Sequence, residues 1–144
     1  MGSTPTASTI SQFYDPRTTS LTSTTAGRRG VVYPMVMLDP EVTPETYVQL
    51  RDSATPPTLL DVREPWEAET ASIPGATLIP LGEITSRAHT ELDPDLPIIV
   101  FCHHGQRSLS VTMWLREQGF DQAQSLSGGI DHYSRVIDHS IPRY

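Results

Sequence analysis

Short apolar runs alternate with helix-like segments along most of this chain, and that alternation limits the possible folds more than any other feature. The clearest runs are TLLDV at 58–62 and IIVF at 98–101, each bounded by charged or turn residues. Apolar runs of this length are typical of strands that are covered on both faces. Five strands that alternate with short helices predict an α/β domain of three layers, in which helices cover both faces of a central, mainly parallel sheet of about five strands.

Helix-start and turn signals place the individual elements. Thr43 is predicted to cap a helix that begins at Pro44, because proline suits the first helical position. The helix after IIVF is expected to bury Leu109, Met113 and Trp114. The strands are expected at 35–38, 58–62, 76–79, 98–101 and, with a turn, 123–129; the helices are expected after 43 and within 63–71, 82–92, 107–120 and 130–137.

The first 34 residues differ in composition from the rest of the chain. Of the first 25 residues 13 are Ser or Thr and few are large and apolar, so this stretch cannot bury enough surface to order itself. We expect residues 1–34 to be a disordered tail or leader and residues 35–144 to be the folded domain. The leader also has features of an organelle transit peptide, of an N-myristoylation site (MGSTPT) and of a twin-arginine signal.

Charge and hydropathy argue against two classes of partner. From residue 31 onward 16 acidic residues are set against 7 arginines, a net charge of −9. Nucleic acids and anionic membrane surfaces need clustered positive charge, so neither is an expected partner. No apolar stretch of the sequence approaches the roughly 18–20 residues of a membrane-spanning helix.

The chain has one cysteine, Cys102, in the stretch FCHHGQRS at 101–108. A single cysteine excludes an internal disulfide, a CxxC redox pair and a zinc site with several cysteines, and it suits a reducing cytoplasm. Its role is that of a metal ligand, of a small buried thiol at the end of a core strand, or of a nucleophile. Cys102, His103 and His104 diverge in a tight turn, and no other histidine has ligand spacing, so we expect no metal and no other cofactor.

The residues after Cys102 favour the nucleophile over the core thiol. HHGQR is polar and leads directly into a helix, and Gly105 can adopt backbone angles that are closed to other residues. A strand–loop–helix unit of this kind directs backbone N–H groups toward an anion, and Arg107 adds a positive charge. Both effects favour the thiolate, the reactive form of cysteine. In a parallel sheet Cys102 would also lie at the carboxyl edge of the strands, where ligands bind.

The stretch CHHGQRS resembles the active-site loop of the rhodanese sulfurtransferases, in which four residues separate the cysteine from an arginine and a serine. LLDVREPWE (59–67), IPGATLIPL (73–81) and LSGGIDHYS (126–134) are similar to further signatures of that family, and the resemblance covers residues 35–144. It implies the rhodanese fold and a sulfur transfer that passes through a cysteine persulfide.

On this resemblance Cys102 is the nucleophile, which takes sulfane sulfur from thiosulfate or a similar donor and passes it to cyanide or a thiol. The partners are then a small-molecule donor and a thiophilic acceptor, with an acceptor protein as a further candidate. Asp61 and Arg63 are expected to brace the loop; the alternative is a surface ion pair of Arg63 with Glu64 or Glu67. The substrate-binding residues are expected to be His103, His104, Gly105, Gln106, Arg107 and Ser108.

The roles within the loop stay partly open. His103 and His104 either bind anions or only line the mouth of the site. Gly105 is expected to serve the backbone conformation, and Ser108 either caps the helix or hydrogen-bonds the sulfur. Trp66 is expected to pack rather than to recognise a substrate.

Three other functions are alternatives. The chain can be a persulfide carrier that delivers sulfur to a partner protein in cofactor or tRNA-thiolation pathways, or a non-catalytic interaction module. Related phosphatases resemble the fold, but their loop has five residues between cysteine and arginine, and they need an acid to protonate an alkoxide leaving group. The shorter loop favours sulfur transfer, because sulfite leaves thiosulfate as a stable anion without a proton.

Overall fold

The computed structural model describes residues 38–144 continuously and, before them, residues 14–15, 20–21, 25–28 and 31–32. The chain divides into two compact units, Met1–Leu38 and Asp39–Tyr144. The predicted division into a leader, 1–34, and a domain, 35–144, stays a prediction.

In the first unit the described residues form two antiparallel pairs of short strands. β1 (Tyr14–Asp15) pairs with β2 (Ser20–Leu21), and β3 (Thr25–Arg28) pairs with β4 (Val31–Val32). The strand expected at 35–38 falls mainly on residues 35–37, which lie outside the described residues.

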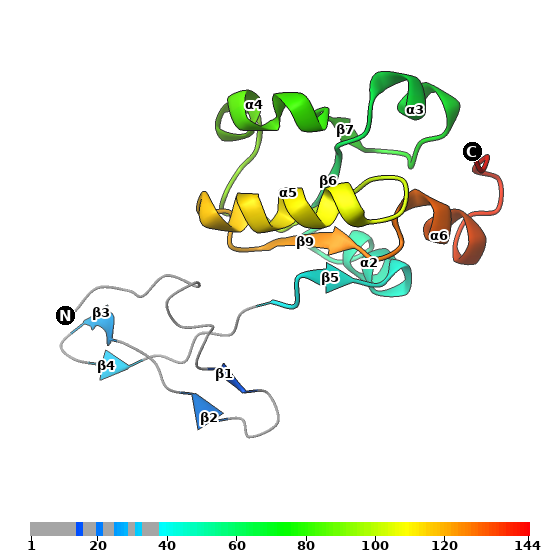
Figure 1. The fold of residues 1–144 in the computed structure, drawn as a ribbon. Helices are drawn as coiled ribbons and strands as arrows, with labels where there is room; N and C mark the ends of the chain where they lie inside the picture. The colour runs from blue at the N-terminus through cyan, green and yellow to red at the C-terminus, as the bar shows by residue number, and fades with distance from the viewer. Residues whose placement is uncertain (1–13, 16–19, 22–24, 29–30, 33–37) are drawn as a thin grey trace. The chain divides into compact units, whose positions relative to one another are not determined.

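The second unit is built on a parallel five-stranded sheet in the order β5–β9–β8–β6–β7 (Figure 1). The strands are β5 (Glu41–Val42), β6 (Thr58–Asp61), β7 (Thr77–Leu78), β8 (Ile98–Phe101) and β9 (Ala123–Leu126). The predicted α/β fold with a parallel sheet of about five strands is therefore confirmed.

The edge strand next to β9 is β5, which lies further along the chain than the strand predicted at 35–38. Hydrogen bonding fixes its position: the carbonyls of Pro40 and Val42 accept from the N–H groups of Ser125 and Ser127 at 2.7 and 2.8 Å.

Helices connect the strands close to where the sequence predicted them. Thr43 caps α2, with its Oγ1 accepting from the N–H of Thr46 at 3.1 Å, as expected. Within the described residues no helix has the length and apolar character needed to cross a membrane. The helices are α2 (Pro44–Arg51), α3 (Pro65–Thr70), the 3₁₀ turn η1 (Leu81–Glu83), α4 (Ile84–Glu91), α5 (Gln106–Glu117) and α6 (Gly129–Val136).

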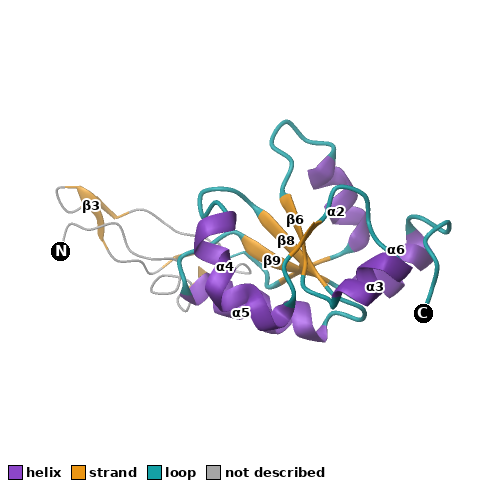
Figure 2. Ribbon diagram, turned by 90° about the horizontal axis from the view of Figure 1, so that it is seen from above, coloured by secondary structure: helices purple, strands orange, loops and turns teal. Residues whose placement is uncertain are grey.

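Helices lie on both sides of the sheet (Figure 2), and each face carries its own cluster of buried side chains. Along β8, Ile98 and Val100 belong to the cluster under α4 and α5, whereas Ile99 and Phe101 belong to the cluster under α2 and α6. Successive side chains of a strand point to opposite faces, so the continuous apolar run IIVF supplies both cores at once. The same alternation directs Cys102, the next residue, toward α5.

The buried face of α5 differs from the prediction. Trp114 packs against the core while partly exposed, Leu109 is half-buried, and Met113 is exposed. The reason is that Ser108 faces the end of β8, and a helix that buries this position also buries those three, four, seven and eight residues further on. The buried residues of α5 are Ser108, Val111, Thr112, Leu115 and Arg116.

Candidate active site

Cys102 directly follows β8 at the carboxyl edge of the sheet, as predicted, and its side chain is 1% exposed. A buried thiol at the end of a core strand is expected both for a residue that only packs and for a protected nucleophile. The contacts of the sulfur separate these two roles.

The sulfur of Cys102 accepts hydrogen bonds at the N-terminus of α5. The N–H groups of Gly105 and Ser108 lie 3.1 and 3.3 Å from Sγ. Gly105 is the N-cap residue, has φ 106°, and supplies no side chain to cap the helix. The sulfur therefore takes the position that an Asp or Ser side chain usually has at a helix start, where it meets the partial positive charge of the helix end.

A short chain of hydroxyls continues from the sulfur into the core. Cys102 Sγ lies 3.4 Å from Ser108 Oγ, which lies 2.8 Å from Ser125 Oγ on β9. Both serines are fully buried. The structure thus gives Ser108 two contacts with the sulfur, through its N–H and its hydroxyl, while Gly105 occupies the N-cap position.

The loop also packs against the N-terminus of α6. The carbonyls of Cys102 and His103 accept from the N–H groups of Ile130 and Asp131 at 2.9 and 3.1 Å. Gly129, with φ 65°, makes this approach possible, because a Cβ at this position would collide with both carbonyl groups. This close contact explains the glycine at position 129, the first residue of α6.

Arg107 closes the loop through an ion pair with Glu67 of α3. Its Nη1 and Nη2 donate to the two carboxylate oxygens at 2.7 and 2.9 Å. The Glu67 side chain is 4% exposed and that of Arg107 is 34% exposed. Hydrogen bonding by Arg107 lowers the pKa of Glu67 to about 2, so the carboxylate is charged at neutral pH. The guanidinium that the sequence assigned to substrate is therefore shared with a buried carboxylate.

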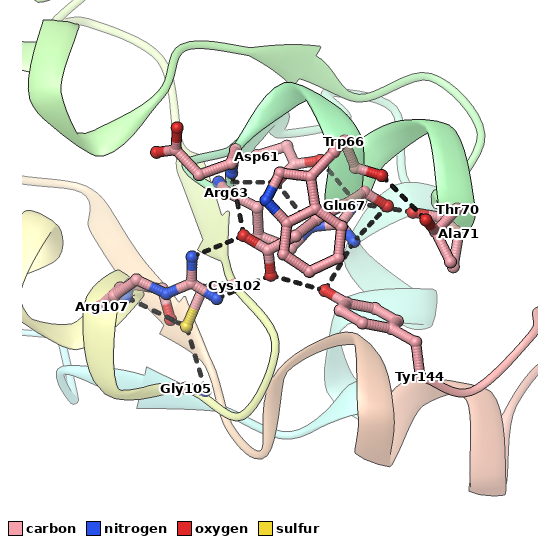
Figure 3. Close-up of polar contacts among 12 residues, drawn as sticks. Asp61, Arg63, Trp66, Glu67, Thr70, Ala71, Cys102, Gly105, Arg107 and Tyr144 are labelled. Atoms are coloured by element: carbon pink, nitrogen blue, oxygen red, sulfur yellow. Dashed lines mark hydrogen bonds and ion pairs between the residues drawn. The ribbon is translucent and has the colours of Figure 1, made fainter.

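Asp61 and Arg63 form a buried pair beside this one (Figure 3). Arg63 is fully buried, and its five N–H groups all donate: to both oxygens of Asp61, to the carbonyls of Glu67 and Ala71, and to the hydroxyl of Tyr144. A surface ion pair with Glu64 or the Glu67 carboxylate, the alternative considered, is not what the structure shows. Arg63 instead holds the backbone of α3, the helix that carries Glu67.

The two histidines of the loop lie in a stack of rings. His103 stacks on Tyr144 with ring centroids 3.9 Å apart and on the exposed His104 at the same separation. Burial lowers the pKa of His103, which favours its neutral form. Trp66, expected to pack, is 60% exposed and meets the edge of Tyr144.

Among the described residues one group of metal-binding side chains comes together: His103, His104 and Asp131 have ligand atoms within 4.8 Å of one another. The two imidazole planes lie at 27°, so their in-plane lone pairs point side by side rather than toward one point. Both carboxylate oxygens of Asp131 pair with arginines, Oδ1 with Arg143 and Oδ2 with Arg135. This arrangement suits an aromatic stack beside an ion pair better than a metal ion.

Three contributors to this site were not predicted from the sequence: Glu67 as the partner of Arg107, Tyr144 and Ser125. A sequence signal exists only for Glu67, which the sequence analysis named as an alternative partner of Arg63. Tyr144 and Ser125 meet the loop only through the fold, so their contacts with it could not be predicted from neighbouring residues.

The comparisons with known proteins agree on one family. The family model of the rhodanese-like domain matches residues 43–135. The rhodanese-like/PpiC domain-containing protein 12 of Arabidopsis thaliana, described as chloroplastic, is 43% identical over 89 residues, which are 60% of this chain and 30% of the relative. The putative sulfur carrier protein YrkF of Bacillus subtilis is 40% identical over 91 residues, 63% of this chain and 49% of the relative.

A solved structure gives the same result. The human single-domain sulfurtransferase TSTD1 superposes with a TM-score of 0.59 at 26% identity, covering 69% of this chain and 98% of that one. The chain spans less than half the length of both curated relatives.

Replacing Gly129 with alanine is expected to displace the Cys102 loop. A Cβ there meets the carbonyls of Cys102 and His103, so the loss of unfolding free energy should exceed the roughly 1–2 kcal/mol of a left-handed alanine alone. Urea unfolding and the rate of Cys102 alkylation measure the two effects. Gly75→Ala is the matched control, since Gly75 has φ 86° and open space around it. Equal losses in both variants would contradict the packing role of Gly129.

Glu67→Gln is expected to remove an acid-sensitive part of the stability. The folded pKa of Glu67, about 2, lies below its ordinary value of 4.5, so its stabilisation is complete above pH 4.5 and is lost as the pH falls toward 2. The shift corresponds to at most about 3 kcal/mol, reduced by solvent at the partly exposed Arg107.

Urea titrations at neutral pH and near pH 3 test this expectation. The difference in unfolding free energy between wild type and Glu67→Gln should shrink at the lower pH. Glu91→Gln is the control, because Glu91 makes the same two-bond contact with Arg87 at the surface. A pH-independent difference for Glu67→Gln, or the same pH dependence in both variants, would show that burial of the Glu67–Arg107 pair does not matter.

Proposed function

The chain belongs to the rhodanese-like family, and from this we propose that it is a sulfurtransferase that carries sulfane sulfur as a persulfide on Cys102. The observation that carries the proposal is the position of the sulfur, which accepts from Gly105 and Ser108 at the start of α5. A thiol that only fills space in a core has no need of donors at a helix N-terminus.

The proposed reaction has two transfers through one covalent intermediate. In the first, the thiolate of Cys102 attacks the outer sulfur of thiosulfate or a similar donor. A sulfur–sulfur bond forms, the donor's sulfur–sulfur bond breaks, and sulfite leaves with the electron pair. In the second, cyanide or a thiolate attacks the outer sulfur of the persulfide, which releases thiocyanate or a new persulfide and restores the Cys102 thiolate.

The loop offers donors for the charge that moves in these steps. Gln106 and Arg107 are the first two residues of α5, so their N–H groups have no acceptor within the helix. We propose that these groups hold the outer sulfur of the persulfide and that the Arg107 guanidinium adds to the field. Because sulfite and thiolate are stable anions, neither transfer needs a general acid. The loop from Cys102 to Arg107 contains no Asp or Glu that could act as one.

The acceptor must come from outside the chain, because the sequence has no second cysteine to resolve the persulfide. A specific alternative is a persulfide carrier that passes sulfur to a partner protein, which the name of the Bacillus relative favours. Loading the protein with sulfur and then measuring transfer to small thiols and to candidate proteins separates the two. Rapid transfer to cyanide or small thiols supports the enzyme; transfer to one protein alone supports the carrier.

Incubation with thiosulfate is expected to add the mass of one sulfur atom to the protein. Cyanide should remove the added mass with formation of thiocyanate, because only a sulfane sulfur reacts in this way. Intact-mass spectrometry measures the gain, and Cys102→Ser is the control that should show none. A wild-type protein that gains no sulfur from thiosulfate or from other sulfane donors would rule out the proposed function.

Arg107→Ala is expected to lower the rate of sulfur transfer on the order of 10²- to 10³-fold, by analogy with the loss of a donor that stabilises developing charge. The same change leaves the buried Glu67 carboxylate without its partner, which is itself damaging. A double variant with Glu67→Gln removes that unpaired charge. The double variant should stay slow if Arg107 acts on the sulfur, and a rate within threefold of wild type would show that it acts only through the fold.

A further inference from the structure

Tyr144 links the Cys102 loop to the buried charges behind it. Its hydroxyl donates to Glu67 Oε1 at 2.8 Å and accepts from Arg63 Nη1 at 3.0 Å (Figure 3). The same Oε1 of Glu67 accepts from Nη2 of Arg107 at 2.9 Å. The hydroxyl is therefore one hydrogen bond away from the carboxylate that holds the last part of the loop.

The ring of the same residue covers the first part of the loop. It stacks on His103 with centroids 3.9 Å apart and an interplanar angle of 8°. His103 directly follows Cys102, and its Nε2 is buried without a hydrogen-bond partner among the described residues. Within the described part of the chain no hydrogen bond of Nε2 orients this imidazole, so the position of His103 depends on stacking against the ring of Tyr144.

The segment that carries Tyr144 is anchored by its own contacts. Ile141 is buried in the core cluster under α6, and Arg143 Nε donates to Asp131 Oδ1 at 3.0 Å. The chain on the N-terminal side of Tyr144 is therefore held by contacts with α6 and the core, apart from the contacts of the tyrosine with the loop.

The link between Tyr144 and Glu67 keeps one protonation state over a wide pH range. Burial and the hydrogen bond to the Glu67 carboxylate together raise the pKa of Tyr144 to about 12. Arg107 holds the pKa of Glu67 near about 2. Between these values the phenol is always the donor and the carboxylate always the acceptor, so the contact is a fixed support rather than a pH switch.

We propose that Tyr144 is a positioning residue of the sulfur-transfer site, which holds His103 by stacking and Arg107 through Glu67. By fixing both parts of the loop it keeps the N–H groups of α5 directed at the sulfur. The inference rests on the proposed function for its effect on sulfur transfer, but its effect on the geometry around Cys102 is independent of that function.

Three variants test the proposal. Tyr144→Phe keeps the ring and removes the hydroxyl, whereas Tyr144→Leu removes both contacts. Tyr133→Phe is the matched control: the Tyr133 hydroxyl also accepts from an arginine, Arg51 Nη1 at 3.3 Å, in a partly buried contact, and it reaches α2 rather than the loop. Thermal melts establish that each variant folds, and Tyr144→Phe carries the test if the leucine variant does not.

Two readouts are needed. The first is the pH profile of Cys102 alkylation by iodoacetamide, which requires no sulfur transfer. The second is kcat/KM for transfer from thiosulfate to cyanide. We expect a loss in kcat/KM of about tenfold for Tyr144→Phe and about a hundredfold for Tyr144→Leu, the usual range for a residue that supports a reactive group indirectly. The alkylation profile of both should move to higher pH, and Tyr133→Phe should stay within threefold of wild type.

The proposal is overturned if both Tyr144 variants keep the alkylation profile of the wild type and a kcat/KM within threefold of it. It is also overturned if Tyr133→Phe changes the profile and kcat/KM as much as the Tyr144 variants do. If the wild-type protein takes no sulfur from thiosulfate or from other sulfane donors while the Tyr144 variants still shift the alkylation profile, the proposed function fails and the positioning role of Tyr144 stands.

Discussion

The hydrogen bonds between the N-terminus of α5 and the sulfur of Cys102 are the contacts on which the rest of the site depends. Helix N-termini leave donors without partners, and here the sulfur satisfies two of them. The main-chain carbonyls of Cys102 and His103 do the same for the N-terminus of α6. The loop is thus held between two helix starts, one bound to its sulfur and one to its carbonyl oxygens, and each helix is itself capped by the loop.

Behind the loop lie two arginine–carboxylate pairs: both members of Asp61–Arg63 are buried, whereas in Glu67–Arg107 only the carboxylate is. Burying such charges is costly, and the cost is offset only where every polar group has a partner. Arg63 meets that condition with five hydrogen bonds, and Glu67 accepts from Arg107, from Tyr144 and from the N–H of Glu64. Because each bond requires a particular geometry, the pairs fix where α3 lies relative to the loop.

Local features of the sequence predicted the elements, since apolar runs, Thr43 and the glycines act over a few residues. They also predicted that Cys102 lies at the sheet edge and that Gly105 serves the backbone conformation, and they left open whether Ser108 caps the helix or hydrogen-bonds the sulfur. The partners of Arg107 and Arg63 were harder to predict: Glu67 lies 40 residues before Arg107, and Tyr144 lies 81 residues after Arg63. An arginine in the sequence indicates that a partner for its charge is needed. Which carboxylate or hydroxyl becomes that partner is decided by the packing of α3 against the loop. The predicted burial of Met113 was wrong for the same reason, because the contacts of Ser108 with Cys102 decide which face of α5 is buried.

The pairing of charges has a consequence for how an anion is held at this site. Glu67 compensates much of the charge of Arg107, and Asp61 compensates that of Arg63. The positive groups left uncompensated near the sulfur are then main-chain N–H groups at the start of α5, which are fixed in place and carry only partial charge. Such donors suit a single negative charge that stays on sulfur throughout, as it does in thiolate and persulfide alike. The direction of these N–H groups depends on backbone geometry rather than on the side chains between Cys102 and Arg107. The residues that support this backbone are Gly129, Glu67 and Tyr144. They therefore matter more to the proposed chemistry than the two histidines that first draw attention in the sequence.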